Sequence, residues 1–234
     1  MAAIITIKRK TVIVFLSIVL AAVTVGAAAA TIVVSVRADN GITIVLDAGH
    51  GGADGGVLGS TTGTKESDVN LSITKYLKKY LEGEGYNVVL TRSDGGAVGK
   101  GVKYNKKEDM RARREIVESA APSLVISIHC NAYPVASVNG AQVFYASGST
   151  QGREVANTVQ GYFNDALNAK PRSAAVGDYY ILNCSEYTSV LCECGFLSNP
   201  AEENKLITAD YQEKVAYTIF TAVKSIFQEQ SASA

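Results

Sequence analysis

The 234-residue sequence has no surplus of basic residues, because 22 lysines and arginines face 22 aspartates and glutamates. Four of the basic residues are Lys8, Arg9, Lys10 and Arg37, so the chain from residue 38 onward carries 18 basic against 22 acidic residues. Nucleic-acid binding needs a clustered excess of lysine and arginine. This composition excludes nucleic acid as a partner and argues against any polyanion held mainly by charge.

Cysteine is also scarce, with Cys130, Cys184, Cys192 and Cys194 in the whole chain. Small secreted scaffolds need a dense framework of disulfides. The roughly 195 residues that follow the N-terminal segment are instead enough to bury a core of their own. A disulfide scaffold is therefore excluded, and we expect four unpaired thiols, most of them buried.

Charged residues are absent from residues 11–36, a 26-residue stretch that follows a basic segment at residues 1–10. An apolar helix of about 20 residues spans a bilayer's hydrocarbon core, whereas the apolar part of a secretory signal has about 7–15 residues. The stretch predicts a transmembrane anchor. Because basic flanks stay in the cytoplasm, we expect a single-pass protein of the cell membrane with the remaining chain extracytoplasmic. Secretion after cleavage at the alanine run 27–30 is the alternative.

Beyond a linker at residues 37–41, apolar runs typical of buried strands alternate with segments of helical periodicity. The alternation predicts one α/β domain over residues 42–228, followed by a flexible tail at residues 229–234. We expect a three-layer sandwich in which helices cover both faces of a mainly parallel, twisted sheet of about six strands. The expected strands are Ile42–Leu46, Tyr86–Thr91, Leu124–Ile128, Gly140–Ala146, Tyr179–Leu182 and Ser189–Cys194. The expected helices are Ser67–Glu84, Glu108–Ala120, Gly152–Ala169, one that starts at Asn199-Pro200 with a cap and a first-turn proline, and Tyr211–Phe227.

The chain has only two histidines, and each follows or ends a predicted strand. His50 comes after the first strand, and His129 ends the run LVISI. The carboxyl ends of parallel strands meet at one edge of the sheet, where ligands bind. A lone histidine is usually a packing residue, but two in such positions predict a shared metal or catalytic site. The glycine-rich loop at residues 49–56 lacks the Gly-Lys-Ser/Thr ending of a P-loop, which excludes nucleotide binding.

A zinc hydrolase takes three protein ligands and leaves a fourth position for water, so a carboxylate must join the two histidines. Glu66 and Glu193 are the candidates. Glu66 stands at a helix start, where an acidic residue is also favoured by the helix dipole. Glu193 lies inside an apolar strand, where an ionised side chain is costly unless it is paired or functional. Strand alternation places Cys192 and Cys194 on the face opposite Glu193, which argues against their joining it at one metal.

Four segments, in order, match the motifs of a known enzyme family. They are LDAGHGGADGG with His50, KESDVNL with Glu66, SIHCNA with His129, and LCECGFLSNPAEENKL with Glu193. Through them, residues 42–228 resemble the zinc-dependent N-acetylmuramoyl-L-alanine amidases. The resemblance implies that His50, Glu66 and His129 bind zinc and that Glu193 is the general base and acid. It implies hydrolysis, in peptidoglycan, of the amide bond between the lactyl group of N-acetylmuramic acid and L-alanine of the stem peptide.

Within that family, the chain looks most like the membrane-anchored spore-cortex amidases. The shared features are the N-terminal apolar segment, the GAQVFY strand and the expected lack of a wall-binding domain. Those enzymes act during endospore formation and prepare muramic-lactam. The resemblance implies peptidoglycan as substrate and leaves room for a protein activator; we expect a monomer. The alternatives are a wall-binding protein with a degenerate site and another zinc hydrolase, such as a peptidase acting on the stem peptide.

Further polar residues could support the site. Asp47 could orient His50 through its second ring nitrogen, or it could close a strand-end turn; Asn131 could do either. Arg113 and Arg172 could meet carboxylates of the stem peptide, with solvated surface positions as the favoured alternative. A cysteine hydrolase that pairs Cys130 with its neighbouring histidine is disfavoured, since adjacent residues on a strand face opposite ways.

Overall fold

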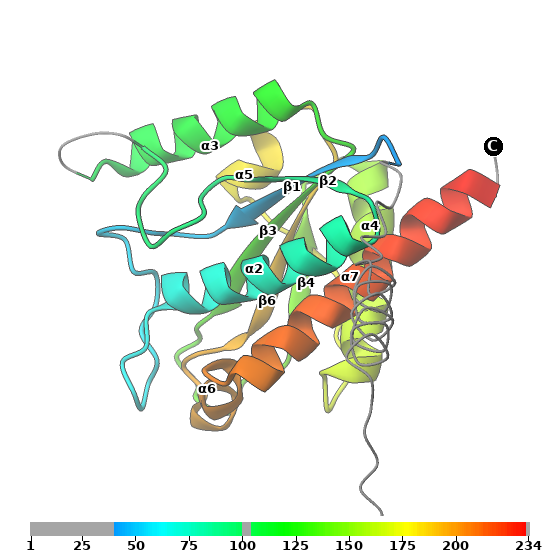
Figure 1. Cartoon of the computed structure of the whole chain (residues 1–234). Helices are drawn as coiled ribbons and strands as arrows, with labels where there is room; N and C mark the ends of the chain where they lie inside the picture. The colour runs from blue at the N-terminus through cyan, green and yellow to red at the C-terminus, as the bar shows by residue number, and fades with distance from the viewer. Residues whose placement is uncertain (1–39, 100–103, 233–234) are drawn as a thin grey trace, which may run out of the picture. The chain divides into compact units, whose positions relative to one another are not determined.

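The computed structural model describes residues 40–99 and 104–232 (Figure 1). Within these residues, six strands form one sheet in the order β2-β1-β3-β6-β4-β5. Neighbouring strands are parallel except β4 and β6, which are antiparallel. The sheet therefore has the predicted size and is mainly parallel. The strands are β1 (Thr43–Ala48), β2 (Asn87–Leu90), β3 (Leu124–Asn131), β4 (Gln142–Tyr145), β5 (Ala175–Val176) and β6 (Ser189–Phe196).

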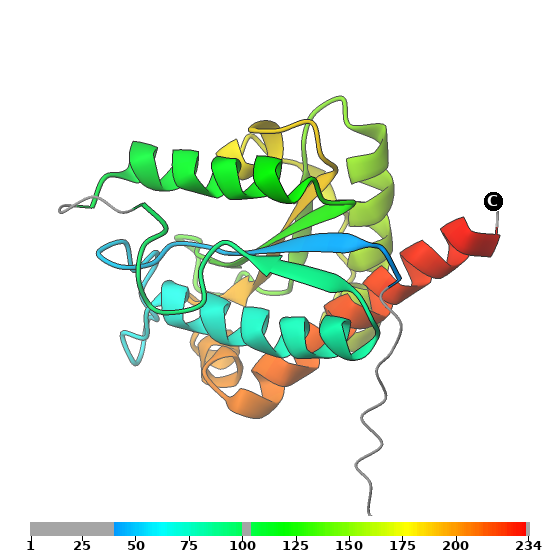
Figure 2. The same cartoon turned by 45° about the horizontal axis from the view of Figure 1, so that its top comes forward.

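Helices lie on both faces of this sheet, which confirms the predicted α/β architecture. In Figure 2, α3 lies on one side of the strands, and α2, α6 and α7 lie on the other. The short α5 packs near α3, while α4 packs beside α7. The described helices are α2 (Glu66–Gly83), α3 (Lys106–Ala120), α4 (Thr150–Ala166), α5 (Tyr180–Asn183), α6 (Pro200–Leu206) and α7 (Ala209–Ala232).

The main core lies between the sheet and the layer formed by α2, α4 and α7. Ile73 of α2 and Phe163 of α4 are completely buried there. A smaller group, Val45, Val117 and Val125, is buried between the sheet and α3. Because β1 and β3 bury side chains toward both groups, their sequences are continuous apolar runs instead of alternating ones.

Local sequence accounts for where two helices begin. The Asn199 side chain accepts hydrogen bonds from two first-turn backbone N–H groups, and Pro200 follows it, as predicted for α6. The helix expected from Glu108 begins slightly earlier, because Asn105 caps α3 through the same kind of side-chain contact.

The strand predicted at Tyr179–Leu182 is wrong. Most of this segment belongs to the short helix α5, and the nearby strand β5 lies upstream. Ile181 and Leu182 are apolar because they pack against Leu191 of β6. A short apolar run has no period long enough to separate a buried strand from a buried helical turn.

The four cysteines are free, as expected. Cys130, Cys192 and Cys194 are buried in the main core, and Cys184 is partly exposed. Glu193 lines a cleft on the opposite face of the sheet. The alternation predicted for β6 is confirmed: the side chains of Cys192 and Cys194 lie in the main core and point away from Glu193 between them.

The anchor predicted at residues 11–36 lies outside the described residues, as do the segment 1–10 and most of the linker 37–41. In the described parts of the chain, no helix combines the length and the apolar character that crossing a bilayer requires. The last helix, α7, continues through Ala232 and so extends into the segment expected as a tail.

Candidate metal centre

His50, Glu66 and His129 meet at the carboxyl ends of β1 and β3, beside the start of α2. Their ligand atoms all lie within 4.8 Å of one another. Glu66 stands between the two rings, with Oε2 3.2 Å from His50 Nε2 and Oε1 2.9 Å from His129 Nδ1. The two histidines therefore share a site, as their positions in the sequence predicted, and Glu66 is the carboxylate that joins them.

Two glycines make room for this cluster. A Cβ at Gly49 would lie 2.3 Å from His129 Nε2, and one at Gly56 would lie 2.3 Å from Glu66 Oε2. His50 itself has a φ of 61°, a left-handed conformation that is uncommon for residues other than glycine. Such strain persists only where the surroundings fix the backbone, and it gathers at functional sites.

Two buried arginines fix that backbone. Arg113 donates to the carbonyl oxygens of Ala48 at 2.9 Å and His50 at 2.6 Å. Arg92 donates to those of Ala48 at 2.8 Å and Gly49 at 2.9 Å. Because a buried cation needs acceptors for its N–H groups, both side chains hold the loop in one conformation.

The solvated surface position favoured for Arg113 is wrong, because the residue is 1% exposed. Arg113 borders the cleft that holds His50, but its guanidinium is bound within the fold. It forms ion pairs with Asp47 at 2.5 Å and Asp109 at 2.9 Å. Arg172 donates to Asn139 O and Gln142 Oε1 and lies over the Phe196 ring, so it also has partners within the fold.

Asp47 does not orient His50, contrary to one sequence-based expectation. Burial alone would raise the pKa of Asp47, but the Arg113 guanidinium and the Ser127 hydroxyl hold it at about 2. The carboxylate beside the second ring nitrogen of His50 is instead that of Asp54, whose Oδ2 lies 3.0 Å from His50 Nδ1. Asn131 also makes no contact of that kind, since its Oδ1 accepts the N–H of the next residue.

Glu66 is held in an ionised state by its neighbours. Burial opposes ionisation, yet hydrogen bonds and charge from both histidines keep its pKa well below the ordinary value. Backbone N–H groups of Val57 and Cys130 donate to its two oxygens, and Asn70 Nδ2 donates to Oε1 at 3.1 Å. Asn70 was not predicted. Its place one helical turn after Glu66 is the feature of the sequence that could have revealed it.

Glu193 lies beside the cluster on β6, in register with His129 on β3. The side chain is 6% exposed, and Oε2 has no hydrogen-bond partner among the described residues. Burial raises the pKa of Glu193 to about 7. A carboxyl group with these properties is suited to taking up and releasing a proton near neutral pH.

Residues 44–225 match the family described as N-acetylmuramoyl-L-alanine amidase. The chain belongs to this family. It is a zinc-dependent N-acetylmuramoyl-L-alanine amidase that acts on peptidoglycan, as the four sequence motifs implied.

Several relatives resemble this amidase over most of their length. The germination-specific N-acetylmuramoyl-L-alanine amidase of Bacillus subtilis is 34% identical over 196 residues, which are 82% of each chain. Among solved structures, the CwlD amidase of Clostridioides difficile, in complex with the GerS lipoprotein, is 34% identical with a TM-score of 0.77. That match covers 80% of this chain and 98% of the other. The AmiC2 amidase of Nostoc punctiforme is 29% identical with a TM-score of 0.70, over 80% and 97% of the two chains.

The residues of the cluster fit the zinc of this family. Two imidazoles and one carboxylate are a typical ligand set for a catalytic zinc ion, with a fourth position left for water. The second nitrogen of His50 is already bound by a carboxylate, as is usual for metal-binding histidines. The three side chains line a cleft of about 610 Å³ together with Glu193, so a substrate has access to them.

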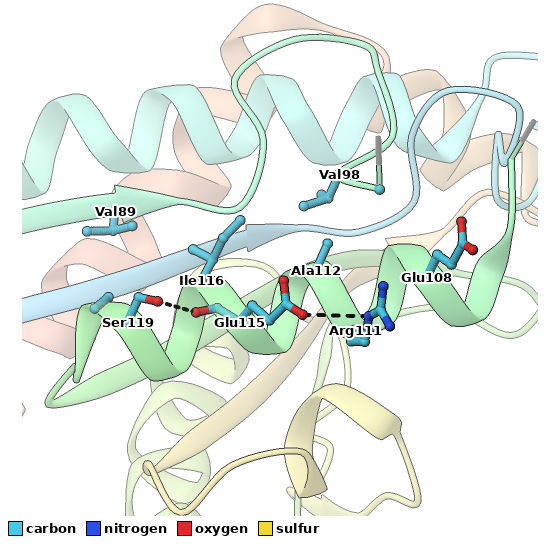
Figure 3. Close-up of a pocket in the computed structure, with 10 residues that line it drawn as sticks. Val89, Val98, Glu108, Arg111, Ala112, Glu115, Ile116 and Ser119 are labelled. Atoms are coloured by element: carbon cyan, nitrogen blue, oxygen red, sulfur yellow. Dashed lines mark hydrogen bonds and ion pairs between the residues drawn. The ribbon is translucent and has the colours of Figure 1, made fainter. Parts of the chain in front are cut away.

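A second hollow of about 830 Å³ lies between α3, the edge strand β2 and the loop that carries Val98 (Figure 3). The described residues that line it include no histidine. Along α3, Arg111 Nε lies 3.6 Å from Glu115, and the Ser119 hydroxyl donates to the Glu115 carbonyl oxygen. The larger hollow is thus not the catalytic cleft of the amidase.

Proposed function

We propose that this amidase binds zinc through His50, Glu66 and His129, and that Glu193 is its general base and acid. The bond cut joins the lactyl group of N-acetylmuramic acid to L-alanine. One observation carries the assignment: three ligand side chains meet within 4.8 Å beside a buried carboxyl oxygen that has no protein partner.

The chain's own residues have separate tasks in this reaction. When bound, zinc supplies Lewis-acid polarisation of the scissile carbonyl and makes water more acidic. Glu193 Oε2 accepts a proton from the attacking water and then delivers it to the leaving nitrogen of L-alanine. Arg92 and Arg113 keep the His50 backbone in place throughout, because their N–H groups donate to the carbonyl oxygens of Gly49 and His50.

Chelation tests this proposal. The purified chain, incubated with peptidoglycan, should release stem peptides that begin with L-alanine; a zinc chelator should abolish the release, and added zinc should restore it. Mass spectrometry of the products distinguishes the alternatives. Fragments cut within the stem peptide would instead identify a peptidase, and zinc-loaded protein without products would favour a binding role.

The amidase is also proposed to act in spore-cortex maturation. The support is its likeness to a relative named germination-specific, over 82% of each chain, and to the CwlD amidase. Expressed in a Bacillus subtilis strain that lacks its germination-specific amidase, the chain should restore muramic-lactam to the cortex. A cortex without muramic-lactam, despite normal levels of the protein, would contradict this role.

The proposed location is the cell membrane, with residues 11–36 as a single anchor and the catalytic domain outside; cleavage and secretion is the alternative. The uncharged stretch supports this location. Fractionation of the same cells separates the two cases by the size and the compartment of the protein. We propose a monomer that can take a protein partner, because the CwlD relative is in complex with a lipoprotein.

A further inference from the structure

The ring nitrogen of His50 that faces away from Glu66 has its own carboxylate partner. His50 Nδ1 lies 3.0 Å from Asp54 Oδ2. The loop doubles back to allow this contact, because Gly51 and Asp54 exchange two backbone hydrogen bonds of 2.8 and 3.1 Å. Gly51 and Gly52 have φ values of 135° and 62°, which only glycine adopts readily.

Asp54 is itself fixed from two sides. Its Oδ1 accepts the backbone N–H of Gly56 at 3.1 Å, and its Oδ2 accepts the Tyr104 hydroxyl at 2.9 Å. Tyr104 belongs to a different part of the chain, directly before the Asn105 cap of α3. Burial and the neighbouring carboxylate raise the pKa of Tyr104, so its hydroxyl stays protonated and donates. The chain of contacts therefore runs from Tyr104, just before α3, through Asp54 to His50.

This arrangement decides which nitrogen of His50 can bind a metal. An imidazole that donates Nδ1–H to a carboxylate presents the lone pair of Nε2 on the other side of the ring. In this structure Nε2 is the nitrogen that faces Glu66, at 3.2 Å. A carboxylate partner also makes the imidazole a stronger ligand.

We propose that Asp54 and Tyr104 are positioning residues of the metal centre: Asp54 sets the ring orientation and tautomer of His50, and Tyr104 holds Asp54 in place. The inference rests on the proposed role of His50 as a ligand and deepens it. The competing explanation is that Asp54 only closes a turn through Gly56. The two explanations differ in what they predict for zinc affinity.

Zinc dissociation constants of the full chain, measured by competition with a chromophoric chelator, test the proposal. Asp54→Asn keeps a side-chain oxygen for the turn but replaces the carboxylate, and it should weaken zinc binding about 10–100-fold. Tyr104→Phe should weaken it by a smaller factor. In the double variant the loss should not exceed that of Asp54→Asn alone, because Tyr104 acts through Asp54.

Two control variants match these changes. Asp94 accepts the backbone N–H of Gly96 at 2.8 Å, the same turn as in Asp54, yet it touches no proposed ligand. Asp94→Asn should therefore keep wild-type zinc affinity. Tyr217 is 53% exposed on α7, and Tyr217→Phe should do the same. Thermal unfolding of chelator-treated samples checks that every variant is folded.

The outcomes separate this inference from the function on which it rests. If His129→Ala loses zinc while Asp54→Asn binds it within about twofold of wild type, the positioning role of Asp54 is overturned and the metal site stands. Additive losses in the double variant would overturn the link through Tyr104. If His129→Ala keeps wild-type affinity, the proposed metal site itself is wrong.

Discussion

Glu193→Gln should lower the rate of amide hydrolysis by roughly 10²–10⁴-fold and leave the zinc content of the protein unchanged. Glu193 is close to the cluster, in register with His129, but it is not among the three side chains whose ligand atoms converge. Glutamine has the same shape and cannot take up a proton, so the proton-transfer step is the one lost.

Stability separates this effect from damage to the fold. Glu193 is buried, and its Oε2 forms no hydrogen bond within the described residues. Because burial of an ionised group without a partner is costly, the neutral amide should leave the free energy of unfolding unchanged or raise it. The rate is measured from released L-alanyl peptides, zinc by atomic absorption, and stability by thermal unfolding. Turnover near that of the wild type with full zinc content would refute the role of Glu193.

A surface glutamate provides the matched control for that experiment. Glu186 is exposed and lies outside the catalytic cleft. Glu186→Gln removes the same charge from the protein but should leave rate, zinc content and stability at wild-type levels. An equal loss of rate in this variant would mean that net charge, through substrate attraction, is responsible instead of proton transfer.

The parts of the fold that could be predicted are those whose signals are local. β1 and β3 are buried on both faces, and this produces apolar runs that need no tertiary information to recognise. The Asn199-Pro200 pair is likewise a helix start in isolation. At Tyr179–Leu182 the apolar pattern reflects packing of the short helix α5 against Leu191 of β6, and the run is too short for its periodicity to reveal this.

In the metal centre, too, local signals could be predicted from the sequence and long-range contacts could not. His50 and His129 could be paired from sequence because strand ends converge in a parallel sheet. Asp54 could not, since its contact with His50 depends on a loop that doubles back through two positive-φ glycines. Arg113 has the sequence pattern of a surface residue, but in the interior its Nη1 donates to Asp47, which lies far away in the sequence. An ion pair between residues far apart in the sequence produces no periodic pattern, so a charged residue buried in this way is predicted to be exposed.

His129→Ala should abolish zinc binding and, with it, amide hydrolysis. His129 lies near the carboxyl end of β3, and its Nδ1 is 2.9 Å from Glu66 Oε1 in the cluster. Only two of the three protein ligands would remain, which is too few for the tetrahedral coordination that tight zinc binding requires. Zinc at about 100 times its dissociation constant adds about 2.7 kcal/mol to wild-type stability, which corresponds to a rise in melting temperature of about 5–10 °C for a domain of this size. The variant should show no such rise.

Cys130→Ala is the matched control, because it changes the neighbouring residue of the same strand without removing a proposed ligand. Cys130 is the next residue on β3 and is buried on the opposite face, and its contact with Glu66 is made by the backbone N–H, which alanine retains. This variant should keep the zinc-dependent rise in melting temperature and most of the activity. Retained activity would also exclude Cys130 as a nucleophile. If His129→Ala bound zinc at unchanged stoichiometry, the metal would lie elsewhere, and the three-ligand assignment would have to be abandoned because His129 supplies one of the two imidazoles available in the sequence.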